Sequence, residues 1–105
     1  MTNTYRLTPR ARQDLISIGR YTLKRWGREQ RNVYLGAIEQ RFKLIAENPY
    51  MGRRRPDIKE GYYSCPQGSH VIFYLIRENG IDIIGIPHQR MDILNYFSTT
   101  DLNET

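Results

Sequence analysis

Residues 70–86, HVIFYLIRENGIDIIGI, carry the strongest indication of how this chain folds. Residues 70–77 carry an almost unbroken run of β-branched, aromatic and aliphatic side chains, which is typical of a central strand. Asn79-Gly80 then supplies two positions that accept a positive φ, and residues 81–86 are again rich in isoleucine, so a β-hairpin is predicted. Because the run is apolar at successive positions, we expect both faces of the sheet to be covered, one by helices and the other by a partner.

Shorter β-type segments lie on either side of a helical region. Residues 58–65 are a weaker strand candidate, and residues 66–69, Pro-Gln-Gly-Ser, form a turn before the hairpin. Near the start of the chain, residues 5–7 alternate and predict a short first strand. Residues 50–56 are interpreted as a basic loop.

Two helices are predicted between the first strand and this loop. Thr8 can cap the first helix and Pro9 suits its first position, whereas Gly27 ends it. The second helix begins near Glu29 and ends at Asn48, because a residue that precedes proline is pushed out of the helical region. The short connection predicts an antiparallel helical hairpin. Three aromatic residues lie on or beside its apolar stripes and are expected to pack in the core, Tyr21, Trp26 and Tyr34.

The order of these elements predicts the α+β class. The expected topology is β-α-α-β-β-β, with the helical hairpin packed on a mostly antiparallel four-stranded sheet. The 105 residues fit one domain, assigned to residues 1–97, in which residues 92–97 add a helical turn. Residues 98–105 are expected to be a polar tail.

The net charge of +5 is unevenly distributed along the chain. Residues 1–60 hold 14 Lys and Arg against 6 Asp and Glu, a balance of +8, whereas residues 61–105 hold 2 against 5, a balance of −3. Of the basic residues 13 are Arg and 3 are Lys, and guanidinium groups bind carboxylates and phosphates in a bidentate manner. The first half is therefore expected to meet an acidic protein or a nucleic acid, the alternative being a solvated helix face.

The sequence also indicates a compartment. No apolar run approaches the roughly 20 residues that span a bilayer, and no N-terminal signal pattern is visible. The single cysteine, Cys65, cannot form an internal disulfide, which agrees with a reducing compartment. We therefore expect a cytoplasmic protein that contacts no membrane.

Few residues form a pattern typical of catalysis or of a bound cofactor. The two histidines and Cys65 lack metal-ligand spacing, and no Gly-rich phosphate loop is present, so neither a metal nor another cofactor is expected. One enzymatic alternative is acid–base cleavage of RNA, for which His70, His88, tyrosines and arginines supply the residue types. The other interpretation is that both histidines satisfy backbone groups at strand ends. We predict no catalytic residue, and both interpretations stay open on the residues alone.

The basic loop carries the best interface candidates. Arg53, Arg54 and Arg55 are expected to be largely exposed, and buried intramolecular ion pairs would make them residues of the fold instead. Tyr62 and Tyr63 follow this loop, and amphipathic aromatic residues together with arginine favour binding hot spots.

Several segments, in order and at matching spacing, resemble the ParE toxins of the RelE/ParE superfamily. The segments that carry the resemblance are Tyr21-Thr22 with Trp26-Gly27, Asn48-Pro49 with Gly52-Arg53, residues 68–74 (GSHVIFY) and residues 88–92 (HQRMD). The resemblance runs from about Tyr5 to Asp92 and implies the fold deduced above.

The resemblance implies the toxin of a type II toxin–antitoxin module that inhibits DNA gyrase and replication without an active site of its own. It also implies neutralisation by a ParD-like antitoxin in a hetero-oligomer, with operator DNA bound only through that complex. The residues expected to bind the antitoxin or the target are Arg53, Arg54, Arg55, Tyr62, Tyr63, His88 and Arg90.

Two positions depart from the family pattern. Relatives usually have a basic residue at the position of Gly85 and a larger apolar residue at that of Pro87, which is expected to end the last strand. These departures leave open an inactive module that only binds the antitoxin. The other alternative is a RelE-like ribosome-dependent mRNA endonuclease, in which His88 would take part.

Overall fold

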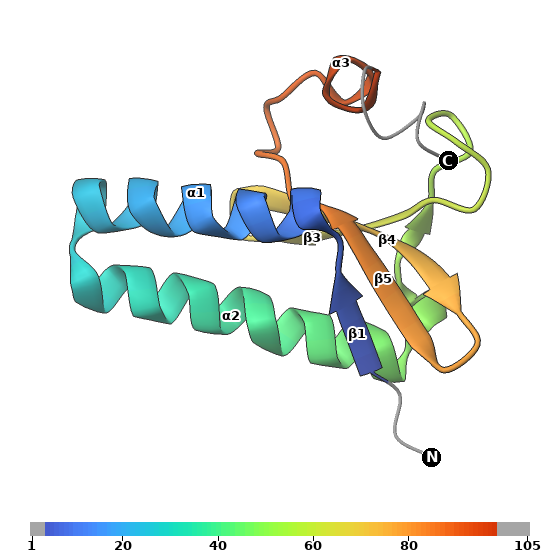
Figure 1. Ribbon diagram of the computed structural model, residues 1–105, viewed down its shortest axis with the longest axis horizontal. Coiled ribbons are helices and arrows are strands. Elements are labelled where there is room, and N and C mark those ends of the chain that lie inside the picture. The colour runs from blue at the N-terminus through green and yellow to red at the C-terminus, as the bar shows by residue number, and fades with distance from the viewer. Residues whose placement is uncertain (1–3, 99–105) are drawn as a thin grey trace.

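The computed structural model describes residues 4–98, in which a helical hairpin forms one layer and a β-sheet forms the other (Figure 1). The elements, in chain order, are β1 (Thr4–Leu7), α1 (Pro9–Trp26), α2 (Arg28–Glu47), the 3-10 turn η1 (Pro49–Met51), β2 (Arg53–Arg54), β3 (Tyr63–Gln67), β4 (His70–Arg77), β5 (Gly80–Gly85) and α3 (Ile93–Phe97). The α+β class is confirmed.

The sheet has five strands in the order β1-β5-β4-β3-β2. β1 runs parallel to β5 and the other neighbouring pairs are antiparallel. The prediction of four strands was wrong because Arg53 and Arg54, assigned to a loop, pair with Ser64 and Tyr63 at the sheet edge. A two-residue strand has no periodicity, so only the neighbouring β3 makes it visible.

The helical hairpin forms as its sequence predicts. Thr8 Oγ1 accepts a hydrogen bond from the Ala11 N–H at 3.1 Å, and Pro9 occupies the first turn of α1. Gly27, at φ 95°, joins the two helices. The buried cluster between helices and sheet is centred on Ile38, Phe42, Ile72, Tyr74 and Ile83.

The strands around the hairpin begin at positions that differ slightly from the prediction. β3 starts at Tyr63 instead of residue 58 and includes Pro66, which lies beyond the two positions paired with β2 and thus on an unpaired edge. The tight turn of the hairpin is Glu78-Asn79, one residue earlier than predicted, and Gly80 already pairs with Thr4. A Cβ atom at Gly80 would lie 1.9 Å from the Thr4 carbonyl oxygen, so β1 fits only against glycine.

The second face of the sheet is covered by the chain itself, which corrects our expectation of a partner there. Phe73 and Ile84 of the sheet pack with Phe97 of α3 and with Tyr62 in the segment before β3. The predicted helical turn at 92–97 is confirmed as α3, capped by Asp92. β5 ends before Pro87, as predicted.

Residues 99–105 of the predicted tail lie outside the described residues. Within residues 4–98, neither long helix is apolar enough to cross a membrane.

Candidate functional site

The end of the helical hairpin that carries Gly27 projects beyond the sheet (Figure 1). Trp26 is 63% exposed and Tyr21 is 65% exposed, although both were predicted to pack in the core. The prediction was wrong because the last turns of α1 extend past the strands and have no sheet to pack on. The cluster of basic residues around this turn, Lys24, Arg25 and Arg28, is the sequence signal that could have indicated its exposure.

These exposed aromatic residues border an open groove of about 600 Å³. It lies between the two helices and the first residues of β4, and it is lined by Tyr21, Thr22, Trp26, Gln30, Tyr34, Ser69, His70 and His88. Tyr34, half-buried, holds one wall: its hydroxyl lies 2.6 Å from Nδ1 of His70 and accepts the Ser69 N–H at 3.0 Å. Gly68 is required beside it, because φ is +60° there and a Cβ atom would lie 2.7 Å from the Tyr34 ring.

His70 and His88 lie side by side in this groove. Their ring centroids are 5.3 Å apart and their backbones form an isolated antiparallel bridge. Burial, followed by the nearby His88, lowers the pKa of His70, against a smaller opposing effect of Asp14. Nδ1 of His88 accepts the Arg90 N–H at 3.1 Å. Nδ1 of His70 therefore contacts Tyr34 of α2, and Nδ1 of His88 holds the turn at Arg90. The lowered pKa means that His70 favours its neutral form.

The three arginines of the basic segment do not act alike. Arg53 and Arg54 are exposed on β2, as predicted, and the Arg54 side chain is 70% exposed beside Glu60. Arg55 contradicts the prediction: its side chain is 20% exposed, pairs with Asp57 at 3.1 Å and lies over the Phe73 ring. Arg55 therefore stabilises the covered second face, whereas Arg53 and Arg54 are exposed at the sheet edge.

The two neighbouring tyrosines also differ. Tyr62, predicted to bind a partner, is 3% exposed and contacts Phe97 edge to face in the second core cluster. Tyr63 is half-buried and stacks on Tyr74, with Tyr50 against its edge. Tyr62 directly precedes β3 and Tyr63 is its first residue, so the two successive side chains point to opposite faces of the sheet.

The predicted binding residues fall in two separate places. Arg54 and Tyr63 pair with each other at the start of β3. His88 lies at the opposite end of that strand, because it bridges to His70, which pairs with Gln67. His88 is half-buried beside His70, and Arg90 is exposed in the next turn. The sequence set is therefore not one site, and the groove residues of α1 and α2 were absent from it.

The environments of Tyr74 and Cys65 disfavour a role for either side chain in catalysis. Tyr74 donates to the Pro49 carbonyl at 2.7 Å and accepts the Gly52 N–H at 3.0 Å, and burial raises its pKa to about 12. Burial also raises the pKa of the Cys65 thiol, which disfavours the nucleophilic thiolate. Residues 4–98 contain no group of three or more His, Cys, Asp or Glu arranged to hold a metal ion.

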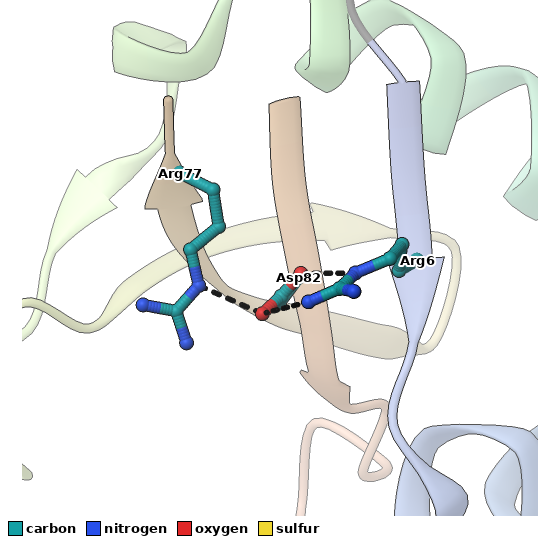
Figure 2. Close-up of polar contacts among 3 residues, drawn as sticks. All are labelled: Arg6, Arg77 and Asp82. Atoms are coloured by element: carbon teal, nitrogen blue, oxygen red, sulfur yellow. Dashed lines mark hydrogen bonds and ion pairs between the residues drawn. The ribbon is translucent and has the colours of Figure 1, made fainter. Parts of the chain in front are cut away.

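Two carboxylates that the sequence analysis did not single out link elements that are distant in the chain. Asp82 of β5 lies between Arg6 of β1, at 3.2 Å, and Arg77 of β4, at 2.8 Å (Figure 2). Burial alone would raise the pKa of Asp82, but the hydrogen bonds and charges of the two arginines lower it overall. Asp14 of α1 accepts the Ile86 N–H at 2.8 Å and the Tyr96 hydroxyl, which holds α3 in place.

The sequence model of the family described as "ParE toxin of type II toxin-antitoxin system, parDE" matches residues 5–93. The chain belongs to the ParE toxin family. Among curated family members, Toxin ParE1 of Caulobacter vibrioides is 40% identical over 88 residues, which cover 84% of this chain and 91% of the relative. Toxin ParE1 of Mycobacterium tuberculosis is 37% identical over 94 residues, covering 89% and 96%. The family resemblance of the sequence is therefore confirmed.

Solved structures share the ParE fold of this chain. A chain of the chromosomal ParDE TA system from P. aeruginosa superposes with a TM-score of 0.70 at 18% identity, covering 83% of this chain and 96% of that one. The YoeB dimer from Staphylococcus aureus gives a TM-score of 0.61 at 19% identity, covering 84% and 98%. At these identities the likeness shows the fold alone.

Proposed function

We propose that this ParE-family toxin inhibits DNA gyrase, and so replication, and that a ParD-like antitoxin neutralises it in the cytoplasm. The observation that carries the proposal is the match of residues 5–93 to the toxin of parDE modules, together with relatives that are 37% to 40% identical over most of their length. The toxin acts by binding and not as an enzyme. Operator DNA is bound only by the hetero-oligomer with the antitoxin.

The site supports a binding role. His70 is engaged by Tyr34, His88 holds the Arg90 N–H, and Tyr74 is buried with a raised pKa, so these groups are poorly placed to exchange protons with a substrate. Two of the side chains that line the groove, Tyr21 and Trp26, are instead large, exposed and aromatic. Such side chains favour protein–protein contacts.

Gyrase assays with the purified toxin test the proposal. We expect inhibition of supercoiling and accumulation of cleaved DNA, both relieved when the antitoxin is added. A toxin that leaves supercoiling unchanged and traps no cleaved DNA would disprove gyrase inhibition for this family member.

One alternative has a specific observation in its favour, because His88 lines an open groove beside His70. A ribosome-dependent mRNA endonuclease that uses this groove would lose toxicity in the variant His88→Ala. We expect that variant to remain toxic. Induction without antitoxin distinguishes the remaining alternative, since an inactive module would not arrest growth.

A further inference from the structure

A second exposed surface lies at the opposite end of β3 from the groove. Tyr50 and Met51 of η1 are 75% and 42% exposed, and the side chain of Arg54 of β2 is 70% exposed. Half-buried Tyr63 links them, because its ring centroid lies 6.2 Å from that of Tyr50 and its backbone pairs with Arg54. We call Tyr50, Met51, Arg54 and Tyr63 the η1–β2 surface. It lies at the start of β3, whereas His70 of the groove pairs with the end of that strand.

The core of the protein holds this surface in one position. The buried hydroxyl of Tyr74 donates to the Pro49 carbonyl at 2.7 Å and accepts the Gly52 N–H at 3.0 Å, so hydrogen bonds fix both ends of η1. Glycine is required at position 52, because a Cβ atom there would overlap the Tyr74 hydroxyl and lie 2.8 Å from the Ser64 carbonyl oxygen. An exposed aromatic ring on a fixed backbone loses little conformational entropy when it binds, which suits an anchor of an interface.

We propose that the η1–β2 surface is the part of the toxin that contacts gyrase, with the Tyr50 ring in an apolar pocket of the target and Arg54 paired with a carboxylate at its rim. The inference rests on the proposed function for its partner, and it adds the surface and the chemistry of the contact. Among residues 4–98, Tyr50 is the most exposed large apolar side chain. Exposed tyrosine and methionine beside arginine are typical of the centres of protein–protein interfaces.

The charge of this surface favours an acidic partner. Residues 50–63 contain four basic and two acidic residues, a balance of +2. Asp57 pairs with Arg55 at 3.1 Å. Glu60 lies 3.4 Å from Arg54, and both of these side chains are at least 70% exposed. Such an exposed pair contributes little to stability, so a carboxylate of the partner can take the place of Glu60 without disturbing the fold.

A protein fits this surface better than a nucleic acid does. Binding to a nucleic-acid backbone rests on several phosphate contacts from lysine and arginine side chains. Here Arg54 and Arg55 each have an acidic neighbour, which weakens the attraction for phosphates. The most prominent group of the surface is instead the exposed ring of Tyr50. A polar rim around an aromatic anchor is the arrangement that protein partners recognise.

Supercoiling assays with toxin variants test the assignment. Tyr50→Ala and Arg54→Ala should each raise the toxin concentration that gives half-maximal inhibition of gyrase by about tenfold or more, the loss expected for a truncated hot-spot residue. Tyr50→Phe retains the ring and should lose much less. The matched controls are Val33→Ala and Arg12→Ala, which remove an exposed apolar and an exposed basic side chain of the helical hairpin and should change this concentration by less than about threefold. Circular dichroism would verify that each variant remains folded.

Hydroxyl-radical footprinting gives a second readout without a variant, because Met51 and Met91 are similarly exposed, at 42% and 47%. When the wild-type toxin is bound to gyrase and DNA, Tyr50 and Met51 should be oxidised several-fold more slowly than in the free toxin. Met91, in the segment before α3, should keep its oxidation rate and is the internal control.

The outcomes separate the surface from the proposed function. If the wild-type toxin inhibits gyrase but Tyr50→Ala and Arg54→Ala inhibit equally well and Met51 keeps its oxidation rate, the surface assignment is wrong and the proposed function stands. The assignment is also overturned if calorimetry shows that these variants lose affinity for the ParD-like antitoxin, or if they lose affinity for duplex DNA in the absence of gyrase. A wild-type toxin that does not inhibit gyrase at all would overturn the proposed function itself.

Discussion

The ring of Tyr96 lies against Gly85 so closely that a Cβ atom at position 85 would come within 2.6 Å of the Tyr96 hydroxyl oxygen. That hydroxyl donates to Asp14, and the Arg10 guanidinium lies 3.8 Å from the Tyr96 ring centroid. The C-terminal helix is thus docked on β5 where the family pattern led us to expect a basic side chain. The departure at Gly85 has a structural cause within this chain.

We predict that Gly85→Ala lowers the free energy of unfolding by about 1–3 kcal/mol, the usual cost of overpacking. Tyr96 cannot simply move aside, because Asp14 binds its hydroxyl and Arg10 lies over its ring. Urea denaturation followed by circular dichroism measures the change. In a Tyr96→Ala background the same substitution should cost much less, and equal costs in both backgrounds would contradict the steric explanation.

Gly36 provides the control for this substitution. A Cβ atom there would meet nothing within 4 Å, and the position lies inside α2. Gly36→Ala should therefore stabilise the protein by about 0.5–1 kcal/mol, since alanine favours the helix.

Asp82→Asn should destabilise the protein at neutral pH and have little effect in strong acid. Burial opposes ionisation of Asp82, but Arg77 and Arg6 lower its pKa below the ordinary 3.8, so its stabilising effect exists above that pH. The effect is lost as the pH falls through the lowered pKa of the folded state. Because both arginine side chains are largely exposed, we expect about 1 kcal/mol at pH 7, measured by urea denaturation.

The matched control for Asp82 is Glu78→Gln, at an exposed position of the neighbouring hairpin turn. It should change the stability very little at either pH. A loss that is the same for Asp82→Asn at pH 7 and at about pH 2 would show that the ionised carboxylate is not what matters.

His70 should make the fold sensitive to mild acid. Its pKa is lowered in the folded state by burial and by His88, so the unfolded chain binds the proton more tightly. Stability is therefore complete above the ordinary pKa of 6.5 and decreases as the pH falls below it towards the lowered value. We expect His70→Asn, whose amide oxygen can replace Nδ1 as an acceptor, to flatten the pH dependence of unfolding below pH 6.5. An unchanged slope would assign the effect to another group.

Substitutions of Tyr62 and Arg54 should differ strongly in their effect on stability. Tyr62→Ala removes a buried ring from the second core cluster and should cost about 3–5 kcal/mol of unfolding free energy. Arg54→Ala removes an exposed side chain beside Glu60 and should leave the melting temperature nearly unchanged. Near-equal melting temperatures for Tyr62→Ala and the wild type would return Tyr62 to the set of binding candidates.

The elements with local signals were predictable from the amino-acid sequence alone. Thr8 and Pro9 start α1, Gly27 ends it, and residues 70–86 alternate apolar runs with a tight turn, so these elements were predictable within a residue or two. Caps, turns and periodicity act within a few neighbouring positions, so one chain segment contains all the information they need. The family resemblance likewise rests on short segments of the sequence.

Which surfaces those elements expose depends on contacts between segments that are distant in the sequence. Trp26 continues an apolar stripe, yet it lies in solvent because α1 is longer than the sheet beneath it. Tyr62 is buried because Phe97 packs over it, and Asp14 contacts Tyr96, which lies 82 positions later in the chain. The burial of a side chain depends on which distant element packs against it, and a local pattern along the chain does not contain that contact.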